Sequence, residues 1–189
     1  MPANKEYIQT KEEEGPQGLL LTWVSGLITA LDWSGRLIAV TCLAIMFVAL
    51  LVNVVLRYAL GTGITWAYEI HAILLPWLVA GGIVIATARG RHIAVNLMSS
   101  LLSGAALTAL VLIVQAALFV ISISILWSSQ PILKASTFQT LATLGIKQVW
   151  GYSSLAYAFG AMALIALLEI VQTLAGKRPP EQTPEASLS

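Results

Sequence analysis

Four stretches of the chain are apolar and nearly free of charge, and each is long enough to cross a bilayer. The hydrocarbon core of a membrane is about 30 Å thick, so a helix rising about 1.5 Å per residue needs about 20 apolar residues to cross it. Backbone N–H and C=O groups in lipid must be hydrogen-bonded within the segment, which favours helices. The predicted spans are residues 37–57, 68–88, 105–127 and 149–174. The pattern therefore predicts an all-α integral membrane protein with four transmembrane helices in an up-down arrangement.

The segments that flank this membrane domain (residues 37–176) are more polar. Residues 1–18 lack the apolar core of a secretory signal, so we expect this end to be retained and cytoplasmic. Residues 19–36 place apolar side chains at roughly helical spacing among polar ones, which predicts an amphipathic helix in the membrane interface. Residues 177–189 are rich in Pro, Glu, Ser and Thr, which is typical of a disordered tail.

Lysine and arginine residues near the ends of the spans predict the orientation, because positive charge resists translocation. With the N-terminus inside, seven such residues fall in cytoplasmic segments and three in outer ones. The inner set is Lys5, Lys11, Arg36, Arg89, Arg91, Lys177 and Arg178, and the outer set is Arg57, Lys134 and Lys147. We therefore expect both termini to be cytoplasmic.

The composition agrees with a membrane protein rather than a soluble enzyme. The 189 residues are 58% hydrophobic and 10% charged, whereas soluble domains carry about 25% charged residues. The net charge of +1 gives no excess of positive charge for a polyanion, so nucleic acid is not an expected partner. The single cysteine, Cys42, lies in an apolar run and cannot build a disulfide or a Cys-based metal site within one copy.

Ionisable residues are absent from the middle of the predicted spans. Burying such a group in a membrane is costly, and carriers that move ions by themselves usually keep one facing the bundle interior. Here Asp32, Arg36 and Glu169 are expected at or near the interfaces, where a side chain can extend toward the headgroups or pair. The pattern argues against a self-sufficient carrier.

The two histidines bear on another possibility, a membrane anchor that holds haem b between two imidazoles. His71 and His92 lie 21 residues apart at opposite ends of one predicted helix, or about 31 Å along its axis. They cannot both ligate one haem within one subunit, so we expect no cofactor and no metal. His92, beside Arg89 and Arg91, is more simply explained as part of a cluster that faces cytoplasmic lipid headgroups.

A more specific arrangement brackets the turn between the first two spans. Asn53 and Arg57 are four residues apart where the first span ends, and Trp66 and Glu69 are three apart where the second begins. The turn at residues 61–63 could bring Arg57 and Glu69 together at the outer edge of the membrane. An exposed ion pair of this kind contributes about 1 kcal/mol or less. The spacing fits either such a pair or a docking feature for another membrane subunit.

Several of these residues belong to a pattern that resembles a known family. The pattern covers the first two spans and the loop after them, with a weaker match before the fourth span. It comprises Asn53, Arg57, Tyr58, Trp66, Glu69, Trp77, the run Ala88, Arg89, Gly90, Arg91, His92, Ile93, Ala94 and Val95, and the run Ala142, Thr143, Leu144, Gly145 and Ile146. Their order and spacing resemble the small membrane subunit (DctQ-like) of tripartite ATP-independent periplasmic (TRAP) transporters. Tyr68, Asn96, Lys147 and Ala158 depart from the usual pattern of that family.

The resemblance implies an accessory subunit of a sodium-driven transporter for organic acids in the bacterial inner membrane, and not an enzyme. The expected partners are a large multi-span subunit that holds the sodium and substrate sites, and a periplasmic solute-binding protein. The residues from Arg57 to Glu69 and from Lys134 to Lys147 are expected near the binding protein. The docking or structural candidates are Asn53, Arg57, Trp66, Glu69, Trp77, Arg89, Arg91, His92, Lys134 and Lys147. The alternative is a tetraspan anchor or assembly subunit of another complex, such as a respiratory enzyme.

Overall fold

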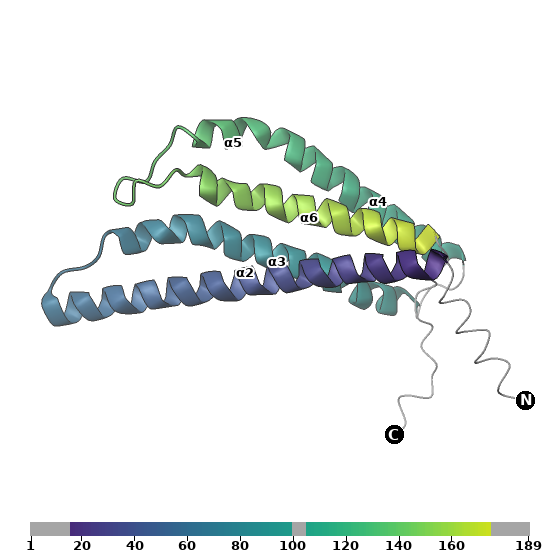
Figure 1. The fold of residues 1–189 in the computed structure, drawn as a ribbon, viewed down its shortest axis with the longest axis horizontal. Helices are drawn as coiled ribbons and strands as arrows, with labels where there is room; N and C mark the ends of the chain where they lie inside the picture. Colours follow the sequence, from purple (N-terminus) through teal and green to yellow (C-terminus); the bar gives the residue numbers. More distant parts are fainter. Residues whose placement is uncertain (1–15, 100–104, 175–189) are drawn as a thin grey trace, which may run out of the picture.

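The computed structural model describes residues 16–99 and 105–174, with side chains placed for residues 22–90 and 105–174. The helices of this part are α2 (Pro16–Leu60), α3 (Trp66–Ser99), α4 (Ala105–Ser128), α5 (Gln130–Ser136) and α6 (Val149–Leu174) (Figure 1). No β-strand occurs among the described residues, and four of the helices are long and apolar enough to cross a membrane. The all-α prediction is confirmed for this part of the chain. The orientation of the helices across a membrane stays a prediction.

Helix α2 is one continuous helix of 45 residues, although the sequence predicts two elements there. No proline interrupts residues 17–60, and the N-terminal half of the helix has core contacts of its own. Ile28 lies in one buried cluster with Val84 of α3 and Ile165 of α6. At a rise of about 1.5 Å per residue α2 is about 67 Å long, which exceeds the full thickness of a bilayer. The helix predicted over residues 19–36 is the first part of α2, and its place in the membrane interface stays a prediction.

The four long helices form an open layer rather than a closed bundle. Their order across the layer is α2, α3, α6, α4, because α2 packs mainly on α3, α3 on α6 and α6 on α4 (Figure 1). Among the described residues α2 and α4 do not touch. The loop after α2 (residues 61–65) and the loop after α5 (residues 137–148) lie at the same end of the layer (Figure 1). We call these two loops the loop rim.

Two glycines bring α2 and α3 close together in the middle of the layer. A Cβ on Gly81 would lie 2.6 Å from the carbonyl oxygen of Gly35, and a Cβ on Gly35 would lie 2.9 Å from that of Gly81. Any side chain at either position would therefore push the two backbones apart. The next two buried residues of α2 after Gly35 are Cys42 and Ala49. They follow at intervals of seven residues and are also small. Small residues at a helix contact allow this kind of close approach.

The segment from α4 through α5 buries one polar residue every seven positions. Gln115, Ser122, Ser129 and Ser136 are between 0% and 8% exposed. The three serines donate hydrogen bonds to carbonyl oxygens of their own helix turn, so their hydroxyls are satisfied locally. A repeat of seven residues is typical of helices that pack side by side with a left-handed crossing. Since α4 and α5 pack mainly on α6, this polar seam faces α6.

Candidate functional site

The side chain of Asn53 holds the turn between α2 and α3. Asn53 is 2% exposed, and its Oδ1 accepts a hydrogen bond from the backbone N–H of Ile64 over 2.6 Å. Gly61 in the same turn has a φ of 70°, a conformation that glycine adopts without steric conflict. Asn53 therefore stabilises the loop rim. The sequence pattern identified Asn53 as a candidate but did not identify its partner, the backbone N–H of Ile64.

The carboxylate of Glu69, in the first turn of α3, binds the loop between α5 and α6. It accepts hydrogen bonds from the backbone N–H of Thr143 at 2.9 and 3.0 Å and from the Thr143 hydroxyl at 2.8 Å. It also accepts one from the backbone N–H of Leu144 at 2.9 Å. Hydrogen bonds to an ionised acceptor are roughly twice as strong as those between neutral groups. Glu69 thus connects the loop of residues 137–148 to α3, the helix that follows the loop of residues 61–65.

The loop that Glu69 binds has an internal hairpin structure. Thr140 and Lys147 form an antiparallel β-bridge, and the N–H of Leu141 donates to the carbonyl oxygen of Ile146 over 3.0 Å. Gly145 turns the chain with a φ of 65°. The run at residues 142–146, which the sequence pattern matched only weakly, lies in the turn of this hairpin.

The proposed pairing of Arg57 with Glu69 is wrong as an ion pair. Within the described residues, the ion pairs join Asp32 to Arg36 and to Arg89, at the other end of α2 and α3. The oxygens of Glu69 are directed to Thr143 and Leu144 instead. Sequence spacing could not reveal this, because the partner lies on a loop more than 70 residues away.

The remaining charged candidates at this end are exposed. Arg57 lies in the last turn of α2 and Lys134 in the last turn of α5, while Lys147 takes part in the hairpin bridge. All three side chains are exposed, and Trp66 at the start of α3 is 40% exposed. The structure therefore brings the predicted outer residues together on one rim. Asn53 and Glu69 each form hydrogen bonds that hold a loop of this rim.

Trp77 connects the two central helices of the layer. Its indole Nε1 donates a hydrogen bond to the carbonyl oxygen of Trp150 on α6 over 2.8 Å. Its ring centroid lies 5.7 Å from that of Tyr157, and the Tyr157 hydroxyl is 2.7 Å from the Ser34 hydroxyl on α2. These contacts run across α2, α3 and α6, so Trp77 is a packing residue of the layer.

Asp32 joins α2 to α3 at the end opposite the rim. Asp32 is 8% exposed and pairs with Arg36 one turn further along α2. Its other oxygen lies 3.2 Å from Nε of Arg89 on α3. Arg89, which the sequence placed in a headgroup-facing cluster, is therefore also a tie between two helices. Arg91 and His92 continue α3, but their side chains lie outside the described residues.

Glu169, near the end of α6, is directed into the layer. It is 2% exposed and accepts a hydrogen bond from the side-chain amide of Gln115 on α4. Of the two outcomes that the sequence left open, extension to the headgroups or pairing, the structure shows pairing, because the carboxylate lies between α6 and α4. The sequence signal that could have found this contact is the polar seam, because Gln115 begins the series that recurs every seven residues on α4 and α5.

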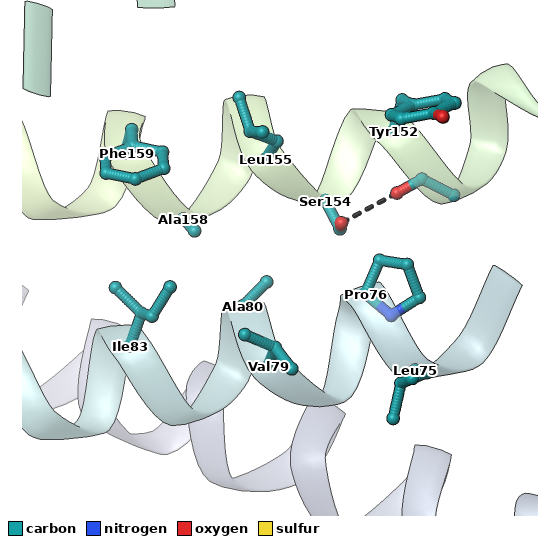
Figure 2. A pocket seen from close by; sticks show the side chains of 11 residues that line it. Leu75, Pro76, Val79, Ala80, Ile83, Tyr152, Ser154, Leu155, Ala158 and Phe159 are labelled. Atoms are coloured by element: carbon teal, nitrogen blue, oxygen red, sulfur yellow. Dashed lines mark hydrogen bonds between the residues drawn. The ribbon is translucent and has the colours of Figure 1, made fainter. Parts of the chain in front are cut away.

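A groove lies between α3 and α6 (Figure 2). It has a volume of about 450 Å³, and none of its lining residues is charged. Leu75 and Val79 on α3 lie across from Leu155 and Phe159 on α6, and about half of the surface of Leu75 and Val79 is exposed. The only hydrogen bond drawn among the lining residues is internal to α6, from Ser154 to Gly151 (Figure 2). The groove can receive an apolar chain and has no group that would bind an ion.

The described residues also contain no cluster of His, Cys, Asp and Glu side chains that could hold a metal ion. The arrangement therefore consists of apolar helices, a loop rim held by hydrogen bonds and several polar contacts between helices.

Comparison with known proteins places this architecture in a family. An uncharacterized protein, y4mM, of Sinorhizobium fredii (strain NBRC 101917 / NGR234) is 34% identical over 100 residues. The match covers 52% of this chain and 18% of that relative, so the chain spans only a small part of the relative's length. A family model, "Tripartite ATP-independent periplasmic transporters, DctQ component", matches residues 46–176, from the second half of α2 through α6. This is a family of transporter components and not of enzymes. The chain belongs to the DctQ component family of tripartite ATP-independent periplasmic transporters.

Proposed function

We propose that this chain is the small accessory membrane subunit of a sodium-driven TRAP transporter that takes up an organic acid. In this role it scaffolds the large transport subunit and helps to dock the periplasmic binding protein. The observation that carries the docking role is the set of hydrogen bonds from Thr143 and Leu144 to Glu69. They join the loop of residues 137–148 to the first turn of α3, directly after the other loop of the rim.

The rim has the charge and exposure of a docking surface. Arg57, Lys134 and Lys147 are exposed there, and the partly exposed carboxylate of Glu69 is hydrogen-bonded to Thr143 and Leu144. Three positive charges outweigh the one carboxylate, so the net charge of these residues is positive and would complement an acidic surface on the binding protein. Phe138, which is 87% exposed, adds an aromatic side chain of the kind that is enriched in interfaces.

The open layer supports the scaffolding role. Its outer helix α2 exposes a series of large apolar side chains, and so does α4 at the other edge. The series includes Leu37, Val40, Phe47, Leu51 and Val55 on α2, and Ile113, Val120 and Ile121 on α4. These surfaces suit either lipid or the helices of a larger subunit. The ion and substrate sites are assigned to the large subunit, as the family resemblance implies, and the buried carboxylate of Glu169 accepts a hydrogen bond from Gln115 within the layer.

The proposed membrane topology follows the distribution of positive charge. With the loop rim on the periplasmic side, both termini are cytoplasmic and the four long helices cross the inner membrane in alternating directions. The amphipathic first part of α2 then lies at the cytoplasmic surface. Fusion of a reporter after residue 62 and after the C-terminus tests this topology, and the opposite pattern of reporter activity would reverse it.

Charge reversal on the rim tests the docking role. In the complete transporter, Arg57→Glu, Lys134→Glu and Lys147→Glu should weaken the affinity for the binding protein and reduce uptake. The matched control is Arg57→Lys, which keeps the charge at the same site. Binding should also weaken as the salt concentration rises, because exposed charges are screened. Unchanged affinity and uptake in the combined reversal variant would contradict the docking role.

Copurification and sodium dependence test the rest of the proposal. The tagged chain, purified from its native membrane in mild detergent, should retain a polytopic protein in fixed proportion. The purified complex in liposomes should accumulate an organic acid only with a sodium gradient and the binding protein. Recovery of a peripheral oxidoreductase, or uptake that continues without sodium, would contradict the corresponding part of the proposal.

A further inference from the structure

We propose that Arg36 of α2 and Arg89 of α3 form a binding site for the phosphate of one anionic phospholipid. The site lies at the end of the layer opposite the loop rim. The proposal goes beyond the transporter role and requires only that α2 and α3 cross a bilayer side by side, so it can fail or succeed independently of that role.

Both arginines lie at the edge of the hydrocarbon region. Arg36 directly precedes the uncharged part of α2, and Arg89 directly follows the uncharged part of α3. Asp32 contacts both side chains, so the two guanidinium groups are neighbours on adjacent helices at one level. A charged group that borders an apolar span of this length lies at the depth of the lipid phosphates.

The three charged groups leave one positive charge uncompensated. Asp32 carries one negative charge, and it is shared by two guanidinium groups with one positive charge each. The side chains of Arg36 and Arg89 are 42% and 52% exposed, whereas that of Asp32 is 11% exposed. The surplus charge is therefore on the accessible side, and one phosphodiester would neutralise it.

The geometry of Arg36 prepares it for a phosphate. Its Nη2 is bound to Asp32, while its side chain is 42% exposed, so the guanidinium can contact a ligand on its accessible side. Its Cζ lies 5.9 Å from the ring centroid of Trp33, a residue that is 64% exposed. Tryptophan is common at the depth of lipid headgroups. Because Asp32 and Trp33 already restrict the guanidinium, little additional side-chain freedom is lost when a ligand binds.

A phospholipid explains these features better than a soluble anion does. The site is continuous with the exposed apolar surface of Leu37 and Val40 on α2, where acyl chains would lie. Basic pockets between transmembrane helices bind anionic headgroups in this way. Free phosphate would make the polar contacts alone, without the apolar ones.

Native mass spectrometry of the full chain in detergent tests the site, with phosphatidylglycerol and phosphatidylcholine as probes. One molecule of phosphatidylglycerol should remain bound in preference to phosphatidylcholine. Arg36→Gln and Arg89→Gln should each weaken that binding roughly fivefold, since one arginine near an anionic headgroup is worth about this factor. The matched control is Arg57→Gln, which removes an exposed arginine at the other end of α2 and should leave binding unchanged.

Three results would overturn the proposal. The first is equal retention of phosphatidylcholine, and the second is an equal loss of phosphatidylglycerol in Arg57→Gln. The third is displacement of the lipid by millimolar inorganic phosphate, which would indicate a simple anion site. If a glutamine variant elutes abnormally in size-exclusion chromatography, Arg36→Lys and Arg89→Lys replace it, because they keep the charge. Retained binding in these lysine variants supports the site, and lost binding overturns it.

Discussion

Glu69 and Thr143 lie 74 positions apart in the sequence and are joined by three hydrogen bonds. The bonds connect the first turn of α3 to the hairpin between α5 and α6, so each loop of the rim depends on the other. A substitution on α3 should therefore change the dynamics of a loop that is distant in sequence. The first prediction follows from this coupling.

Replacement of Glu69 with glutamine should loosen the hairpin at residues 139–148. Glutamine has nearly the same size, but it offers one neutral carbonyl oxygen in place of two charged ones. Hydrogen–deuterium exchange should become faster at the amides of the hairpin, including Thr143 and Leu144. Thr143→Val should have a similar but smaller effect, because the backbone N–H bonds remain.

A double-substitution cycle separates this coupling from general destabilisation. Since the two residues share hydrogen bonds, the effects of Glu69→Gln and Thr143→Val should not add in the double variant. Tyr68→Phe, beside Glu69 and 59% exposed, serves as the control and should leave the exchange unchanged. Exchange in the hairpin that is unaffected by Glu69→Gln would show that the carboxylate does not hold the loop.

The contact between Gly35 and Gly81 predicts opposite effects for two adjacent glycines of α3. In Gly81→Ala the new Cβ would lie 2.6 Å from the carbonyl oxygen of Gly35, so α2 and α3 must separate. Overpacking of this kind costs about 1–3 kcal/mol. In Gly82→Ala the new Cβ meets nothing within 4 Å, and the helix should gain about 0.5–1 kcal/mol from reduced backbone freedom. Reversible unfolding in mixed detergent measures both; two changes of the same sign would contradict the close approach.

The spans could be predicted from the sequence because hydropathy and helix length depend on local composition. Arg36 and Arg89 mark the ends of uncharged runs whether or not the two helices touch. Their common partner, Asp32, lies 57 positions before Arg89, and nothing in the spacing selects that pair over others. The order of the helices across the layer decides such contacts, and that order is a property of packing.

The contact of Glu169 could not be predicted from the sequence either. Near the end of a predicted span, a carboxylate can extend to the interface or turn inward, and hydropathy does not distinguish the two. The inward position requires a polar partner on a neighbouring helix. Gln115 supplies it, from a helix that begins more than 60 residues earlier.

The hydrogen bond from Trp77 to Trp150 predicts a small and specific loss of stability. Trp77→Phe keeps an aromatic ring near Tyr157 but removes the indole N–H. The carbonyl oxygen of Trp150 still accepts a bond from the Ser153 hydroxyl, so it is not left without a donor. We expect a loss of about 0.5–1.5 kcal/mol, the usual net value of one hydrogen bond. Thermal unfolding followed by circular dichroism measures it.

The matched control for Trp77→Phe is Trp150→Phe. The Trp150 side chain is 63% exposed, and the hydrogen bond uses its backbone carbonyl, which the substitution leaves in place. The control should therefore be close to wild type in stability. An equal loss in both variants would assign the effect to the removal of tryptophan in general rather than to the bond.

The buried contact between Glu169 and Gln115 predicts that polarity, rather than charge, is needed between α4 and α6. Glu169→Gln keeps an oxygen that can accept a hydrogen bond from Gln115, so its effect on stability should be small. Glu169→Leu removes that oxygen and leaves the Gln115 amide facing an apolar group, at a cost of about 1–3 kcal/mol. Interhelical hydrogen bonds in membranes average about 0.6 kcal/mol, so the lower part of this range is expected.

Glu169→Leu combined with Gln115→Leu should recover part of the loss, because neither partner then requires the other. Unfolding of the purified chain in mixed detergent measures the four proteins, with Ser124→Leu, an exposed position on α4, as the control. A Glu169→Leu variant as stable as the wild type would mean that the contact does not hold α4 against α6.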